Sequence, residues 1–110
     1  RIGRSMLEPP LAKEDVLLDI GSGAGDLLFA LLPTLGAGIG VELNRDGHRA
    51  ACAALGVALA NGTCAKYNAR YINADVRDVP DVIAEATVVW MNSIAFSHAL
   101  MRAVAASLAR

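Results

Sequence analysis

The chain has 110 residues, of which 55% are hydrophobic, and its formal net charge at pH 7 is −1. A chain of this length and apolar content can build one globular domain with its own core, which excludes an intrinsically disordered segment. The near balance of charge gives no bulk attraction to nucleic acid or to an anionic membrane, and no apolar run approaches the ~18 residues of a membrane-spanning helix.

Residues 1–15 form an entry segment in this interpretation, and the domain itself spans 16–110. The entry segment carries little hydrophobic periodicity, and Pro9-Pro10 prevents a regular helix at that point. Because the chain begins at Arg1 and stops at Arg110 within a helical pattern, we expect it to be the N-terminal part of a larger fold.

The first predicted strand, Val16–Ile20, is a continuous apolar run, as in strands that are buried on both faces of a parallel sheet. It runs into Asp19–Gly25, whose sequence is Asp-Ile-Gly-Ser-Gly-Ala-Gly. Glycines at alternate positions let the backbone leave a strand, turn sharply and enter a helix, with no Cβ atoms blocking the approach of a ligand. The turn is therefore predicted to be a nucleotide-cofactor loop, formed by Gly21, Ser22, Gly23 and Gly25.

Two acidic residues at this loop, Asp19 and Asp26, favour S-adenosyl-L-methionine over a dinucleotide as the ligand. Asp19 would be a poor neighbour for the pyrophosphate of a dinucleotide, whereas S-adenosyl-L-methionine brings cationic ammonium and sulfonium groups to such a loop. The dinucleotide fingerprint also needs Gly or Ala at position 26, where this chain has Asp26. The sequence therefore predicts S-adenosyl-L-methionine as the cofactor, with Asp19 in its site.

The next helix and strand are predicted over 26–32 and 38–43, and the strand terminates in Glu42. In doubly wound nucleotide folds, an acid about 20 residues past the first glycine binds the ribose hydroxyls, so Glu42 is the predicted ribose ligand. An alanine-rich helix is predicted from Asp46 to Ala60, where Asn61-Gly62 provides a turn.

A third strand is predicted around Tyr71-Ile72 and closes on Asp75, and a short helix is expected to begin at Pro80. The fourth predicted strand, Thr87–Met91, is β-branched and aromatic, and Asn92 stands at its carboxyl end.

This alternation of strands with helices predicts an α/β fold: an open, doubly wound, mostly parallel sheet, of which the chain supplies the first four strands. Ser97 is the expected N-cap of a last helix. In such sheets, ligands lie beyond the carboxyl ends of the strands. Four chemically notable residues fall at or beside those ends: Asp19, Glu42, Asp75 and Asn92.

These residues resemble the class I S-adenosylmethionine-dependent methyltransferases, whose Rossmann-like sheet carries an acid-x-Gly-x-Gly-x-Gly turn after its first strand. The matching segment here is Asp19–Gly25. Within that superfamily, this turn, Gly40–Glu42 and Val88–Phe96 together are similar to the non-SET histone-lysine methyltransferases named for disruption of telomeric silencing. Ser93 stands where that family has a second asparagine.

The resemblance implies roles in cofactor binding. The glycines receive the methionine portion of the cofactor, Asp19 neutralises its ammonium group, and Glu42 accepts hydrogen bonds from both ribose hydroxyls. Asp75 accepts a hydrogen bond from the exocyclic amine of adenine. Val76, at a position where the family has an aromatic residue, packs against the adenine ring.

The resemblance also implies an acceptor site. Asn92 and Phe96 wall the pocket in which an acceptor amine meets the methyl group, because an asparagine can orient an amine and an aromatic face can steady an alkyl-ammonium group. The implied partner is a protein acceptor, such as a histone lysine. The expected localisation is intracellular, and nuclear if the acceptor is a histone.

Structural alternatives stay open for each site residue. The glycine turn could be a plain strand-to-helix connection, Glu42 an exposed strand-end residue and Asp75 a loop cap. Asn92 could cap a helix and Phe96 could pack in the core. At the level of function, the alternatives are a cofactor-binding module without catalysis and a nicotinamide dinucleotide oxidoreductase.

The remaining polar residues are predicted to have ordinary roles. Cys52 and Cys64 lack metal-ligand spacing and are expected to be reduced structural thiols. His48 and His98 are expected at the surface or at helix caps, and no metal site is predicted. The arginines are interpreted as a solvated scatter and not as a nucleic-acid patch: Arg45, Arg49, Arg70 and Arg77.

Overall fold

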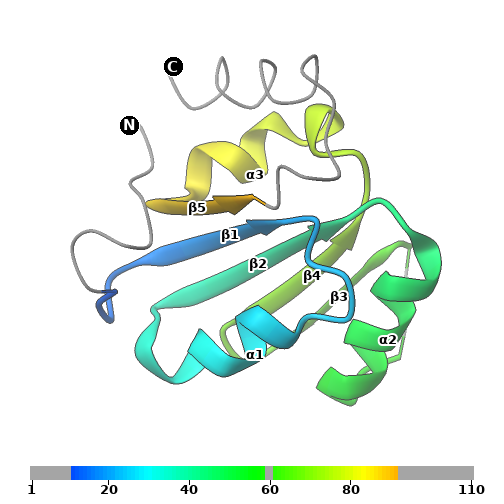
Figure 1. Cartoon of the computed structure of the whole chain (residues 1–110), viewed down its shortest axis with the longest axis horizontal. Coiled ribbons are helices and arrows are strands. Elements are labelled where there is room, and N and C mark those ends of the chain that lie inside the picture. Colours follow the sequence, from blue (N-terminus) through cyan, green and yellow to red (C-terminus); the bar gives the residue numbers. More distant parts are fainter. Residues whose placement is uncertain (1–10, 59–60, 92–110) are drawn as a thin grey trace.

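A single five-stranded sheet organises the part of the chain that the computed structural model describes, residues 11–58 and 61–91. The strands lie in the order β3-β4-β2-β1-β5 (Figure 1). Their bounds are β1 Val16–Ile20, β2 Ala37–Glu42, β3 Thr63–Lys66, β4 Ala69–Asn73 and β5 Val88–Met91. The helices are α1 Asp26–Leu31, α2 Arg45–Leu55 and α3 Pro80–Glu85, with 3-10 turns η1 Leu32–Thr34 and η2 Val76–Asp78.

Helices cover both faces of this sheet. Leu28 of α1 and Ala51 of α2 pack in one apolar core with Leu17 of β1, while Ile83 of α3 packs with Leu18 in the core on the other face. Figure 1 shows α1 and α2 together on one side of the sheet and α3 on the other. Consecutive residues of β1 thus face opposite cores, which explains why its sequence is a continuous apolar run.

The parallel, doubly wound arrangement predicted from the sequence is confirmed. β1 pairs in parallel with β2 and with β5, and β2 pairs in parallel with β4. The helix after β2 ends at Leu55, because Gly56 adopts a left-handed conformation (φ 78°) that stops it before the predicted end at Ala60.

One strand was missed. β3 pairs antiparallel with β4 through a tight turn at Tyr67-Asn68. No strand was predicted between the helix expected to end at Ala60 and the strand expected at Tyr71. Tyr67 has φ 55°, in the left-handed region that non-glycine residues rarely adopt. The turn has Tyr-Asn in place of the usual Asn-Gly or Asp-Gly signal, so the hairpin was not predicted. The described sheet consequently has five strands where four were predicted.

The missed strand also overturns the prediction of reduced thiols. Cys52 of α2 and Cys64 of β3 form a disulfide across 12 residues of sequence. Both cysteines are buried, with exposed fractions of 0% and 3%. The prediction was wrong because Cys64 reaches α2 only when residues 63–66 form an edge strand beside β4.

No helix in residues 11–58 and 61–91 is long and apolar enough to span a membrane.

Candidate functional site

Three acids predicted for the site lie in or just after strands whose carboxyl ends are at the same edge of the sheet (Figure 1). Asp19 lies in β1, Glu42 ends β2, and Asp75 comes two residues after β4. The register places Asp19 beside Gly40 and Glu42 beside Asn73. The sheet thus places the three acids at the carboxyl ends of three adjacent strands, β1, β2 and β4.

The glycine turn has a backbone that only glycine adopts without strain. Gly21, Gly23 and Gly25 have φ values of 80°, 55° and 88°. The amides of Gly21 and Ser22 donate to the carbonyl oxygen of Val41 at 2.8 and 3.3 Å, which fixes the turn against the end of β2. A Cβ placed on Gly23 would meet no atom within 4 Å, so the turn is open on that side.

Glu42 connects this turn to helix α2. Its Oε1 accepts from the amide of Gly23 and its Oε2 accepts from the amide of Asn44, both at 2.7 Å. Asn44 in turn caps α2, because its side chain accepts from the amides of residues 46 and 47. An acidic side chain therefore already occupies the glycine turn, where a dinucleotide fold would offer free amides to phosphate.

Asp19 is a buried carboxylate with no cationic neighbour among the described residues. Its exposed fraction is 3%, and among the described residues no hydrogen-bond donor contacts its side chain. Burial, and to a smaller extent the negative charge of Glu42, raise the pKa of Asp19 to about 6. A carboxylate of this kind at the edge of a ligand-binding fold indicates a functional site, because a cationic ligand would stabilise its charge.

Tyr71 of β4 packs against the glycine turn and supports it, a role that was not predicted from the sequence. Its side chain is 1% exposed, and its hydroxyl donates to the carbonyl oxygen of Gly25 at 3.2 Å. A Cβ on Gly25 or Gly40 would lie 2.6 or 2.5 Å from atoms of Tyr71. Gly40, inside a strand, was the signal for this close approach. Burial and the charge of Asp19 raise the pKa of the Tyr71 hydroxyl.

Asn73 holds the end of β2 and was missed as well. Its amide nitrogen donates to the carbonyl oxygens of Glu42 and Leu43 at 2.9 and 3.1 Å. The side chain of Leu43 is 69% exposed, directly after the acid that ends the strand. The site therefore offers an exposed apolar surface next to Glu42, which suits a flat base better than a hydrated phosphate.

Asp75 and Val76 have structural roles. Asp75 caps η2, since Oδ1 accepts from the amide of Arg77 at 2.9 Å, and the guanidinium of Arg77 pairs with the same carboxylate. This hydrogen bonding lowers the pKa of Asp75. Val76 is 3% exposed and packs in the core on the α3 face. Contacts of these two residues with adenine stay a prediction.

The prediction that His48 lies at the surface or at a helix cap was wrong. His48 is 2% exposed, with no partner for Nδ1 and with Nε2 3.5 Å from Cys52 Sγ, because α2 turns this residue toward the sheet. Burial lowers the pKa of His48, and the charge of Glu42 acts in the opposite direction. Arg70 and Arg77 pair with Glu85 and Asp75, and their side chains stay 37% and 49% exposed, in keeping with the predicted solvated positions.

Several predictions receive no structural support from the described ranges. Asn92 and Phe96, the predicted acceptor-site residues, lie outside the described residues, as do Ser97 and His98. Ser22 Oγ is buried without a hydrogen-bond partner. Within 11–58 and 61–91, no group of three or more His, Cys, Asp or Glu side chains could hold a metal ion.

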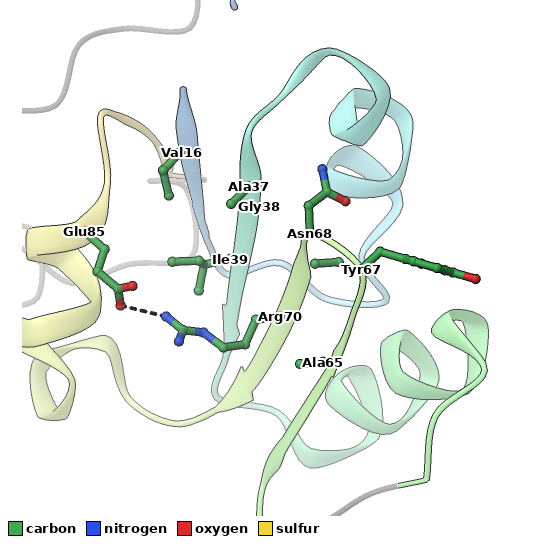
Figure 2. A pocket seen from close by; sticks show the side chains of 10 residues that line it. Val16, Ala37, Gly38, Ile39, Ala65, Tyr67, Asn68, Arg70 and Glu85 are labelled. Atoms are coloured by element: carbon green, nitrogen blue, oxygen red, sulfur yellow. Dashed lines mark hydrogen bonds and ion pairs between the residues drawn. The ribbon is translucent and has the colours of Figure 1, made fainter. Parts of the chain in front are cut away.

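A hollow of about 270 Å³ lies at the opposite edge of the sheet. Figure 2 shows Val16, Ala37 and Ile39 along its wall, with the ion pair between Arg70 and Glu85 (2.7 Å) crossing it. Val16 and Ala37 begin β1 and β2, so this hollow is at the amino ends of the strands. It is separate from the glycine turn and from the acids.

Solved structures share this fold. An S-adenosylmethionine-dependent methyltransferase from Thiobacillus denitrificans, in complex with S-adenosyl-L-homocysteine, aligns over 88% of this chain with 24% identity and a TM-score of 0.57. A precorrin 8W decarboxylase from Methanobacterium thermoautotrophicum aligns over 93% with 15% identity and a TM-score of 0.62. The fold is the Rossmann-like fold of methyltransferases. No family model and no curated protein matches the sequence.

A third similar structure is a Haloferax volcanii protein assigned as a methyltransferase, in complex with the Trm112 methyltransferase activator. It aligns over 68% of this chain with 23% identity and a TM-score of 0.51. The chain covers 30%, 53% and 38% of the Haloferax, Methanobacterium and Thiobacillus proteins. At these identities the likeness extends to the fold, and the decarboxylase shows that one fold carries more than one activity.

Proposed function

We propose that this chain is the cofactor-binding part of a methyltransferase that uses S-adenosyl-L-methionine. One observation carries the proposal: the open glycine turn is bordered by two carboxylates, Asp19 and Glu42, with no cation from the described residues beside either. Such a site repels a pyrophosphate and attracts a cationic amino-acid ligand.

The residues present fit each portion of this cofactor. The open side of Gly23 leaves room for the amino-acid portion, and Asp19 provides negative charge for the ammonium group. Each oxygen of Glu42 accepts one backbone hydrogen bond and keeps a lone pair for a ribose hydroxyl. Leu43 offers an exposed face to the adenine ring, and Asp75 keeps acceptor capacity for its amine.

The bound cofactor would supply a methyl group that is activated for in-line transfer to a nucleophile. The chain itself contributes alignment and charge, because such a displacement needs orientation and a desolvated lone pair more than a strong base. A protein nitrogen, such as a histone lysine, is the proposed acceptor. That part of the proposal rests on the sequence resemblance at Asn92 and Phe96.

The test is a calorimetric titration of the 110-residue chain with S-adenosyl-L-homocysteine, S-adenosyl-L-methionine and NADH. We expect both S-adenosyl ligands to bind and NADH to bind more weakly, because its pyrophosphate meets the acids. Tighter binding of NADH would overturn the proposal. Binding without methyl transfer to any acceptor peptide would favour the alternative, a cofactor-binding module that does not catalyse the reaction.

Glu42→Ala should weaken the binding of S-adenosyl-L-homocysteine by about 1–3 kcal/mol, since it leaves two ribose donors unpaired. Glu14→Ala removes an exposed carboxylate before β1 and serves as the matched control, with no expected change in affinity. Urea unfolding of both variants separates a loss of binding from a loss of folding. An unchanged dissociation constant in Glu42→Ala would show that this residue is not the ribose ligand.

A further inference from the structure

Strand β4 contacts both halves of the candidate site without contributing one of the predicted ligands. Tyr71 reaches the glycine turn, and Asn73, two residues later, reaches the end of β2. The two contacts differ in the part of the site that they hold. The two residues also differ in position: Tyr71 is buried in the core between the sheet and helices α1 and α2, whereas Asn73 is the last residue of β4.

The contact from Tyr71 is specific to the end of the turn. The carbonyl oxygen of Gly25 accepts from the Tyr71 hydroxyl at 3.2 Å and also from the amide of Phe29, the first turn of α1, at 2.9 Å. The ring of Phe29 lies 5.5 Å from that of Tyr71. The hydroxyl therefore fixes the point at which the glycine turn becomes a helix, while the ring is held by packing.

Room for this contact comes from two glycines. A Cβ on Gly25 would lie 2.6 Å from the Tyr71 hydroxyl oxygen, and a Cβ on Gly40 would lie 2.5 Å from its ring. Real Cβ atoms do not approach this closely, so both positions must lack a side chain while Tyr71 occupies this place. The absence of a side chain at Gly40 thus makes room for the residue that supports the turn.

The contact from Asn73 holds a different segment. Its amide nitrogen donates to two consecutive carbonyl oxygens, those of Glu42 and Leu43. The amide of Ala74 donates to the carbonyl oxygen of Glu42 as well, at 3.2 Å. These bonds fix the direction in which Glu42 and Leu43 leave the sheet, which are the residues proposed above for ribose and adenine.

We propose that β4 positions the cofactor through two separable contacts: Tyr71 positions the glycine turn that receives the amino-acid portion, and Asn73 positions the Glu42-Leu43 segment that receives the nucleoside portion. Both side chains bond to backbone carbonyl oxygens of the site and are proposed to act through those segments, so both are positioning residues. This inference rests on the proposed function. It assigns a purpose to two hydrogen-bonded side chains of β4 that lie outside the predicted ligand set.

Binding measurements with two ligands distinguish the effect of the Tyr71 contact from that of the Asn73 contact. S-adenosyl-L-homocysteine has both portions, whereas methylthioadenosine has the nucleoside and lacks the amino-acid portion. Tyr71→Phe removes the hydroxyl and keeps the ring, and it should weaken S-adenosyl-L-homocysteine by about three- to tenfold, the size of one net hydrogen bond, with methylthioadenosine unchanged. Asn73→Ala should weaken both ligands by the same factor.

Tyr67→Phe is the matched control, because that tyrosine is 91% exposed and lies away from the turn in the β3–β4 hairpin. It should change neither affinity. Equal weakening of both ligands by Tyr71→Phe would mean a general structural role and would overturn the division of labour. If Tyr71→Phe does not fold, Asn73→Ala still decides, since a loss confined to S-adenosyl-L-homocysteine contradicts the proposal.

Binding of neither ligand by the unaltered chain would overturn the proposed function and this inference with it. The proposed function and this inference are both supported if the unaltered chain binds both ligands, Tyr71→Phe weakens only S-adenosyl-L-homocysteine, and Asn73→Ala weakens both ligands equally. The affinities of the unaltered chain therefore test the proposed function. The loss of affinity for S-adenosyl-L-homocysteine relative to methylthioadenosine in each variant tests the proposed role of β4.

Discussion

Two buried aspartates lie four positions apart at the two ends of β1, and they differ in what surrounds them. Asp15, before the strand, is 2% exposed, and its carboxylate accepts from the amide of Ala12 and the hydroxyl of Thr87, both at 2.9 Å. Asp19, near the carboxyl end, is 3% exposed and receives no hydrogen bond from the described residues. Burial alone therefore does not distinguish a structural acid from a functional one, whereas the supply of donors does.

The two edges of the sheet repeat this difference. At the amino edge, Arg70 and Glu85 pair with each other across the hollow, so their charges are neutralised within the protein. At the carboxyl edge, Asp19 and Glu42 are two negative charges that repel each other. The charges at the amino edge are paired within the protein, whereas the carboxyl edge holds negative charge that a cationic ligand can neutralise.

The largest expected effect is on Asp15. Asp15→Ala removes the acceptor of two donors in a buried place, and we expect the free energy of unfolding to fall by about 2–4 kcal/mol. Urea unfolding measures this change. The affinity for S-adenosyl-L-homocysteine should stay the same in the folded fraction, and a selective loss of affinity would remove the distinction between the two aspartates.

Asp19→Asn should have the opposite effect on stability. It replaces a buried charge by a neutral amide, and we expect the free energy of unfolding at pH 7.5 to rise by about 1–3 kcal/mol while the cofactor binds about tenfold more weakly. Unfolding in urea and calorimetry on one preparation test both signs. A variant that is less stable than the unaltered chain would show that Asp19 is satisfied in the native state.

The pH dependence of stability and of cofactor affinity gives a second test of the role of Asp19. The pKa of Asp19 is raised in the folded state from its ordinary value of 3.8 to about 6, so the folded state binds this proton more tightly. The resulting stabilisation is complete below about pH 4 and is lost as the pH rises through about 6. Affinity for the cationic cofactor should increase over the same interval. The Asp19→Asn variant should show neither trend, because its side chain at this position does not titrate.

The smallest effect belongs to the amino edge. Glu85→Gln breaks the ion pair with Arg70, whose side chains are 52% and 37% exposed, and should lower the free energy of unfolding by no more than about 1 kcal/mol. Cofactor affinity should not change. A measurable loss of binding in Glu85→Gln would mean that the two edges are coupled, contrary to their separation in the sheet.

Sequence reasoning predicted the parts of this molecule whose signals are local. β1, the glycine turn and the acid at the end of β2 were predicted at their observed places, because each is a short run of residues with its own pattern. The parallel order followed from the alternation of strands and helices. Whether Glu42 binds ribose stays a prediction.

The missed features depend on residues that meet only after folding. β3 has a hairpin turn without the usual turn residues, and the disulfide follows from β3. The burial of His48 depends on which face of α2 meets the sheet. Tyr71 and Asn73 support loops that lie 46 and 31 residues earlier in the chain, and no local pattern reports such contacts.

The disulfide has a consequence for how this chain can associate. β3 is an outer strand of the described sheet, and such strands are the ones that copies of a protein exchange in domain swapping. The bond between Cys52 and Cys64 closes the chain into a covalent ring that joins β3 to its own helix. Under oxidising conditions β3 therefore cannot be exchanged between copies unless α2 moves with it.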